Sequence, residues 1–241
     1  MAIYEVKNGE GIIPEGTTVI ERGAFKGCED LKSLIIPEGV TSIGDNAFEG
    51  CKNLESITIP ASVKKIAVAW NAFKDCTALK SIVVAEDNPK YSSRGCNAII
   101  YTDWNELVAA CSTTVIPDGV RSIASNVFTY RDWLKSINIP ASVTDLGCGT
   151  PSNIFGYSPA LESIVVAEGN PKYDSRGGCN AIIDTESNTL VFGCATTIIP
   201  EDVTAIASQA FRACENLTSI TIPASLTSIK AYVFQNCDSL A

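Results

Sequence analysis

Residues 36–58 read IPEGVTSIGDNAFEGCKNLESIT, and this stretch decides the fold because its pattern returns along the whole chain. Each copy opens with an Ile-Pro pair. The copies start near seven isoleucines: Ile13, Ile36, Ile59, Ile116, Ile139, Ile199 and Ile222. Four of the six intervals between them are 23 residues long, so the chain is a repeat protein.

Two further apolar positions stay in register with the Ile-Pro pair. A phenylalanine follows in every copy: Phe25, Phe48, Phe73, Phe128, Phe155, Phe211 and Phe234. A leucine lies six residues beyond each phenylalanine: Leu31, Leu54, Leu79, Leu134, Leu161, Leu217 and Leu240. Such agreement predicts one structural unit per copy.

Each unit contains the pattern of a short strand. Leu54 is followed by Ile57 and Ile59, and apolar residues two apart ahead of a proline indicate a strand that the proline ends. A period of 23 residues falls in the range of leucine-rich repeats, where one turn cannot bury its apolar side alone. Neighbouring turns must therefore stack, with their strands about 4.8 Å apart.

The motif IPEGVTSIG at 36–44, followed by AFEGC at 47–51 and by Leu54, resembles the BspA-type leucine-rich repeats of bacterial surface proteins. The resemblance implies an α/β solenoid that is mostly β, a right-handed superhelix of stacked parallel strands. It also implies a place on the cell surface or outside the cell, and attachment to host proteins or to other cells. We expect a single solenoid over residues 1–241.

Two intervals are long because they contain the same insertion, at 85–115 and 167–198. Each insertion contains Asn-Pro-Lys-Tyr, at 88–91 and 170–173, which we interpret as a turn. A β-rich stretch, a polar turn (102–105 and 185–188) and a second apolar stretch then predict a hairpin with a four-residue loop. The Ile-Pro repeat resumes in phase after each insertion, so we expect widened coils of the same solenoid.

Nine of the ten cysteines divide into two groups, and Cys148 has no evident partner. Five occupy one slot, three residues after the repeat phenylalanine, and are expected to be small buried side chains: Cys28, Cys51, Cys76, Cys214 and Cys237. Pairing across the predicted hairpins places two more pairs opposite each other, Cys96 with Cys111 and Cys179 with Cys194. These pairs would be disulfides in an oxidising compartment and free thiols in a reducing cytosol.

Composition excludes several functions. The chain has no histidine, which removes Ser-His-Asp and Cys-His catalysis together with histidine metal ligation. Paired C-x-x-C zinc motifs are missing, and Asp87, Asp103 and Glu168 have no spacing that implies shared catalysis. We expect no enzyme, no cofactor and no metal.

Charge and hydropathy narrow the range of partners. The formal net charge of −9 argues against nucleic acid and anionic lipid as partners. No apolar run approaches the roughly 18–20 residues that cross a bilayer, so we expect no membrane insertion. The first residues lack the pattern of an export signal, so either such a signal is missing from this chain or the protein stays in the cytoplasm. We expect a monomer.

The strand residues between the inward-facing ones should face solvent and form two columns. The first column is Ser33, Ser56, Ser81, Ser136, Ser163 and Ser219. The second is Ile35, Thr58, Val83, Asn138, Val165 and Thr221. We hypothesise that this face binds a protein or a glycan, with Trp70, Trp104 and Trp133 as exposed anchors. The alternative interpretation is that these residues only suit a packed parallel sheet.

Two functions remain. The first is a non-catalytic surface or secreted interaction protein, including adhesion, that uses a repeat-built face. The second is an architectural or intracellular scaffold without a dedicated ligand. Locating the native protein in membrane, medium and cytosol fractions would separate them.

Overall fold

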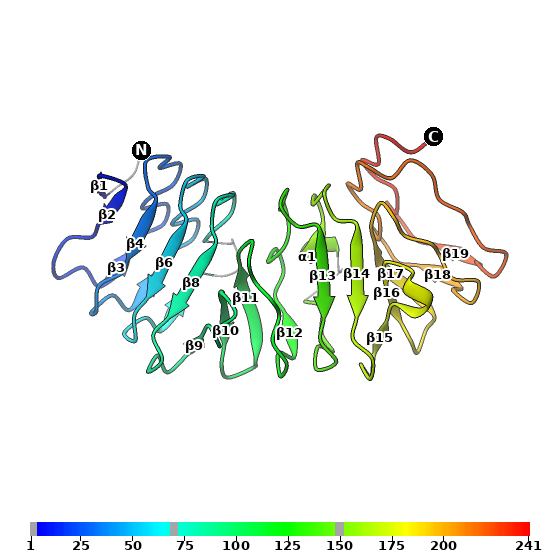
Figure 1. Cartoon of the computed structure of the whole chain (residues 1–241), viewed down its shortest axis with the longest axis horizontal. Helices are drawn as coiled ribbons and strands as arrows, with labels where there is room; N and C mark the ends of the chain where they lie inside the picture. The colour runs from blue at the N-terminus through cyan, green and yellow to red at the C-terminus, as the bar shows by residue number, and fades with distance from the viewer. Residues whose placement is uncertain (1–3, 68–71, 148–151) are drawn as a thin grey trace. The chain divides into compact units, whose positions relative to one another are not determined.

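The structure, a computed structural model, describes residues 4–67, 72–147 and 152–241. The chain divides into two compact units, Met1–Pro117 and Asp118–Ala241. Both are built of stacked coils whose regular secondary structure is almost entirely short β-strands (Figure 1). Helix in the described ranges is limited to α1 (Ser152–Phe155) and the 3-10 turn Arg176–Gly178. The predicted mostly-β solenoid of stacked coils is therefore confirmed.

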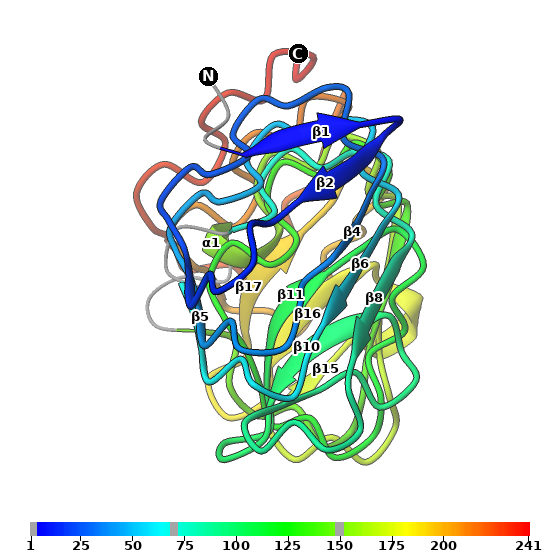
Figure 2. The same ribbon diagram turned by 90° about the vertical axis from the view of Figure 1, so that its left-hand side faces the viewer.

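In unit 1, one strand from each coil joins a five-stranded sheet. Its order is β1 (Glu5–Lys7), β2 (Glu10–Ile12), β4 (Ser33–Ile35), β6 (Ser56–Ile59) and β8 (Ser81–Val84). β1 and β2 are antiparallel, whereas β2, β4, β6 and β8 pair in parallel and lie side by side in Figure 2. Leu34, Ile57 and Ile82 are paired neighbours on the buried side, as the alternation of the sequence predicts.

A second strand from each coil forms a smaller parallel sheet in unit 1. Its order is β3 (Val19–Ile20), β5 (Ser42–Ile43) and β7 (Lys65–Ile66). The Ile-Pro turn separates the two strands of a coil because proline has no N–H to donate to a ladder. The coils that contain β2, β4 and β6 therefore each contribute one strand to each sheet.

The repeat phenylalanines of unit 1 form a stack. The ring centroids of Phe25 and Phe48 are 5.7 Å apart, and those of Phe48 and Phe73 are 5.3 Å apart. The rings are nearly parallel, with interplanar angles of 18° and 13°, and all three side chains are buried. Burial of each such ring contributes about 1.5–3 kcal/mol, so the stack is a main source of cohesion between coils.

The long coil of unit 1 carries three antiparallel strands: β9 (Tyr91–Ser92), β10 (Ala98–Tyr101) and β11 (Glu106–Ala110). β10 and β11 form a hairpin whose loop is residues 102–105. The pairing begins as Tyr101 with Glu106 and shifts by one residue between Ile99 and Ile100. This shift is a β-bulge, where two residues on one strand oppose one on the other.

Unit 2 repeats this plan. β12 is Ser122–Ile123, and β13 (Ser136–Ile139) pairs in parallel with β14 (Ser163–Val166). The long coil supplies β15 (Tyr173–Asp174), β16 (Ala181–Asp184) and β17 (Thr189–Gly193), which are antiparallel. β18 (Ala205–Ile206) and β19 (Ser228–Ile229) continue that sheet in parallel. Its hairpin has the loop 185–188 and the same bulge, between Ile182 and Ile183.

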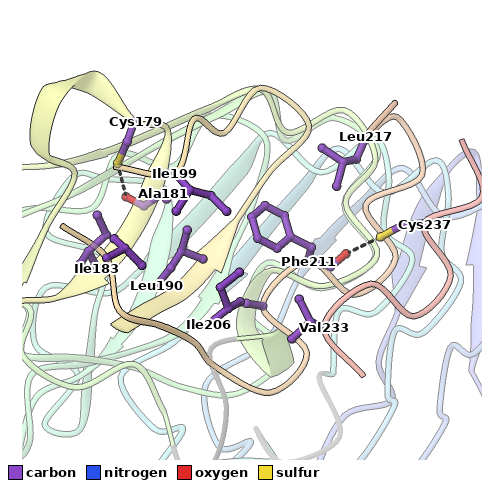
Figure 3. Close-up of a cluster of buried hydrophobic side chains, with 12 residues drawn as sticks. Cys179, Ala181, Ile183, Leu190, Ile199, Ile206, Phe211, Leu217, Val233 and Cys237 are labelled. Carbon is purple, nitrogen blue, oxygen red and sulfur yellow. Dashed lines mark hydrogen bonds between the residues drawn. The ribbon is translucent and has the colours of Figure 1, made fainter. Parts of the chain in front are cut away.

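The core of unit 2 contains a ring that the repeat pattern does not include. Phe128 stacks on Phe155 at 5.7 Å, and Phe192 of the hairpin lies 5.1 Å from Phe155. The next residue, Gly193, leaves room for Phe211, since a Cβ on this glycine would lie 2.3 Å from the ring. Phe211 packs in the same cluster as Leu190, Ile206, Leu217 and Val233 (Figure 3).

Candidate functional site

The two predicted columns of the strand face exist in unit 1. Ser33, Ser56 and Ser81 are directly paired across β4, β6 and β8, and so are Ile35, Thr58 and Val83. The apolar members are open to solvent, with Ile35 76% and Val83 46% exposed. We call these six residues the strand face.

In unit 2 the columns are shorter. Ser136 pairs with Ser163, and Asn138 pairs with Val165, which is 45% exposed. Ser219 and Thr221 are exposed but lie in an irregular segment outside any strand. Strand pairing in unit 2 therefore brings together four of the six predicted residues. Residues 217–222 are described, and they do not form the strand that the repeat predicts. No ladder holds Ser219 and Thr221 beside the other four.

The side chains of the strand face are suited to binding a partner rather than to catalysis. Its hydroxyls can donate and accept hydrogen bonds, and its isoleucine and valine side chains can lose water on contact. Parallel strands keep these groups in straight columns, which gives an extended surface. Ionisable side chains are absent from the six residues, so the face offers neither an acid nor a base.

The candidate tryptophan anchors differ from one another. Trp104 is 69% exposed at the tip of the β10–β11 hairpin. Trp133 is half-buried, with the guanidinium carbon of Arg131 lying 5.9 Å from its ring centroid, so its predicted exposure is only partial. Trp70 lies outside the described residues.

Beside Trp104 the surface of unit 1 has an open hollow of about 240 Å³. One wall is Lys64 and the β7 residue Lys65, and the other is the hairpin with Tyr101, Trp104 and Glu106. Tyr91 and Val108 complete the lining and are both buried. We call this feature the aromatic hollow. Sequence reasoning missed it because its walls lie about 40 residues apart in the chain.

Hydrogen bonds fix the aromatic residues of the hollow. The Tyr101 ring is 5.6 Å from Tyr91 and 5.3 Å from Trp104, the latter edge to face at 79°. The Tyr101 hydroxyl donates to Asp103 Oδ2 at 2.9 Å, and Lys90 Nζ lies 2.7 Å from the same oxygen. The Lys90 hydrogen bond, followed by that of Tyr101, lowers the pKa of Asp103. The Asp103 carboxylate is ionised at neutral pH, as aspartates ordinarily are, and its hydrogen bond holds Tyr101 in place.

The repeat cysteines have a more specific role than filling space. The thiols of Cys51, Cys76 and Cys237 each donate to the carbonyl of the phenylalanine one coil earlier, at 3.0, 3.1 and 3.0 Å. Where the slot holds Ser158, its hydroxyl donates to Phe128 O at 2.7 Å in the same way. The slot thus favours a small donor, and the serine at position 158 was the available signal. The coil of Phe128 is an exception, since Arg131 fills its slot.

The hairpin cysteines are not opposite each other as predicted. The bulge shifts the register so that Cys111 continues opposite Asn97 and Cys194 opposite Asn180. Accordingly the Cys111 thiol donates to Asn97 O at 3.2 Å, and the Cys194 thiol to Asn180 O at 3.4 Å. All nine described cysteines are free thiols in the structure. Cys148 lies outside the described residues, and the two disulfides stay a prediction.

Thiol labelling tests both groups of cysteines. Burial raises the pKa of Cys51 and of Cys214 to about 12, so less than about one thiol in a thousand is ionised at pH 8. We expect iodoacetamide to leave both unlabelled in the native protein at pH 8. Unfolding without reductant should then expose ten labelled thiols by mass spectrometry if the hairpin pairs are reduced, and six if both are oxidised.

The three carboxylates Asp87, Asp103 and Glu168 differ in their surroundings. Asp87 and Glu168 are exposed, and Asp103 is held by Lys90 and Tyr101. Within the described residues, no group of three or more cysteine, aspartate or glutamate side chains could hold a metal ion. Over the same residues, no helix has the length and apolar character needed to cross a bilayer.

Comparison with known proteins gives a family and a set of structures. The model of the BspA type leucine rich repeat region matches in six copies, at residues 4–102, 105–175 and 191–241. No curated protein sequence matches the chain.

Three crystal structures are similar to this chain. A leucine rich cell surface protein from Faecalibacterium prausnitzii is 29% identical, with a TM-score of 0.55 over 92% of this chain and 61% of that one. The pneumococcal vaccine antigen PcpA is 21% identical, with a TM-score of 0.50 over 92% and 47%. A leucine-rich repeat protein from Eubacterium ventriosum is 19% identical, with a TM-score of 0.52 over 96% and 77%. The last two show the fold alone, and this chain spans less than two thirds of the first two.

Proposed function

Because this chain belongs to the family of BspA-type leucine-rich repeat proteins, we propose that it is a non-catalytic interaction protein that binds a protein or glycan partner on its strand face. The carrying observation is the column of Ile35, Thr58 and Val83 across three paired strands. Exposed isoleucine and valine aligned on a rigid sheet offer apolar area that costs little ordering on binding.

We place the protein on the cell surface or outside the cell, in a role that includes adhesion. Support comes from the family and from the Faecalibacterium neighbour, which is a cell surface protein.

We further propose that the chain is monomeric and forms a single right-handed solenoid, in which both hairpin coils keep the phase of the repeat. Its support is the resumption of the Ile-Pro repeat after each insertion.

A binding screen against extracellular matrix proteins and glycans, with a strand-face variant beside the wild type, tests this function. The variant combines Ser56→Arg, Thr58→Glu and Ser81→Glu. Arginine and glutamate at the paired positions 56 and 81 attract each other, which limits the loss of stability. We expect the variant to bind at least ten-fold more weakly, because charged side chains must be desolvated at the interface.

A matched control carries the same charges elsewhere. Thr18→Arg, Ala224→Glu and Ser239→Glu change exposed residues outside the strands by the same net charge and should leave binding intact. Binding that survives in the strand-face variant would show that another surface is used. A screen without any partner, together with native protein in the cytosol fraction, would favour the intracellular scaffold instead.

A further inference from the structure

The hairpin fold does not require Tyr101 or Trp104. The second hairpin has the same loop length, register and bulge, yet it carries Asp184 where the first has Tyr101 and Ser187 where the first has Trp104. There the Asp184 carboxylate accepts from the Ser187 N–H at 2.9 Å and hydroxyl at 2.8 Å. A large indole that is 69% exposed is therefore not explained by the folding of its own loop.

The aromatic hollow also carries unpaired positive charge. Lys64 and Lys65 are exposed on one wall, and neither ammonium forms an ion pair with any residue that the structure describes. This contrasts with Lys90, which is neutralised by Asp103. The Glu106 carboxylate lines the same hollow, but the two ammonium groups outnumber it. In a chain with a net charge of −9, the hollow is therefore locally positive and favours an anion.

We propose that the aromatic hollow binds the terminal residue of a carboxylated saccharide. The apolar C–H face of the sugar ring would pack on the Trp104 indole, and its carboxylate would lie against Lys64 and Lys65. The volume of about 240 Å³ is below the ~300–1,000 Å³ of pockets for drug-sized ligands, which favours one sugar ring over a peptide segment.

The hollow is prepared for such a ligand. Asp103 holds the Tyr101 hydroxyl, and Tyr101 meets Trp104 edge to face, so the platform is ordered before binding. The site is open and makes few contacts, so a single sugar should bind with a Kd on the order of 1 mM. This proposal does not depend on the strand face, since the two residue sets share no member.

The test uses two probes that differ only in the carboxylate, methyl β-D-glucuronide and methyl β-D-glucoside, with the full chain. Ligand-observed saturation-transfer NMR should show the glucuronide binding at least three-fold better. Trp104→Ser, which installs the residue of the second hairpin, should weaken glucuronide binding at least ten-fold. Lys64→Thr with Lys65→Asp, again residues of the second copy, should abolish the preference for the glucuronide.

Several controls keep the proposal open to refutation. Ser187→Ala should change nothing, and circular dichroism melts of all variants report folding. If Trp104→Ser unfolds the protein, Trp104→Phe serves instead, and the Trp104 indole N–H resonance of the wild type must shift with glucuronide. The proposal is overturned if neither sugar binds, if binding survives Trp104→Ser, if acetate alone shifts that resonance equally, or if a glutamate-rich hexapeptide binds there more tightly than the glucuronide.

Discussion

Phe48→Ala is expected to lower the free energy of unfolding by about 3–5 kcal/mol, the largest effect of any single change we predict. Its ring is fully buried and is stacked on Phe25 on one side and on Phe73 on the other. Truncation removes both contacts and leaves a cavity that two flanking coils cannot fill, because each is held in place by its own ladder. Urea unfolding followed by circular dichroism measures the loss.

Two matched variants test the cause. Phe48→Leu keeps most of the apolar volume and should cost roughly half as much. Phe234→Ala removes the same side chain from a half-buried position that stacks on Phe211, so it should cost less than Phe48→Ala. Equal losses for Phe48→Ala and Phe234→Ala would contradict the view that stacking between two coils provides the cohesion.

Asn88→Ala is expected to cost about 3 kcal/mol, since net hydrogen bonds contribute about 1 kcal/mol each and unmade buried ones cost more. The buried side-chain amide donates to Pro60 O at 2.7 Å and to Val63 O at 3.0 Å, both in the preceding coil. Its oxygen accepts from the N–H groups of Lys90 and Tyr91 at 2.9 and 2.8 Å. One amide thus satisfies four backbone groups, and melting temperature and urea midpoint report its loss.

Asn88→Asp separates the two halves of this network. A carboxylate still accepts from the two N–H groups but faces two carbonyl oxygens without a proton to donate, so at pH 7 it should destabilise at least as much as Asn88→Ala. Asn170 makes the equivalent four bonds in unit 2, at 3.1, 2.8, 2.9 and 2.9 Å, and Asn170→Ala should behave alike. A loss below 1 kcal/mol in both units would refute the role of this amide.

The periodic part of the fold could be predicted from the sequence. A 23-residue repeat places Phe25, Phe48 and Phe73 in one column whatever the detailed backbone, because stacking is the way such a unit buries its apolar side. Alternation within each strand likewise predicts Ser56 and Thr58 outside and Ile57 inside, as observed. The Asn-Pro pair predicted the turn at Asn88, but the four hydrogen bonds of the Asn88 side chain could not be predicted.

The remaining features depend on exceptions to the period. A bulge adds one unpaired residue, and periodicity does not show where it falls, so the predicted opposition of Cys96 and Cys111 was wrong by one position. Phe192 joins the aromatic stack from a hairpin, made possible by Gly193. The first hairpin has Ala109 and Ala110 at the corresponding positions. The effect of this difference on packing can be recognised only when the residues nearby in space are known. The aromatic hollow likewise depends on a long-range contact between β7 and the hairpin.

The two hairpins keep one backbone geometry while their loops, residues 102–105 and 185–188, read TDWN and TESN. Substitutions in these loops can therefore change what the hairpin tips recognise without changing the stability of the coils beneath them. Antibody loops vary in the same way on an unchanged β-sandwich domain. For the same reason the tip at 185–188, which has no aromatic side chain, is a suitable place to insert and display foreign peptides.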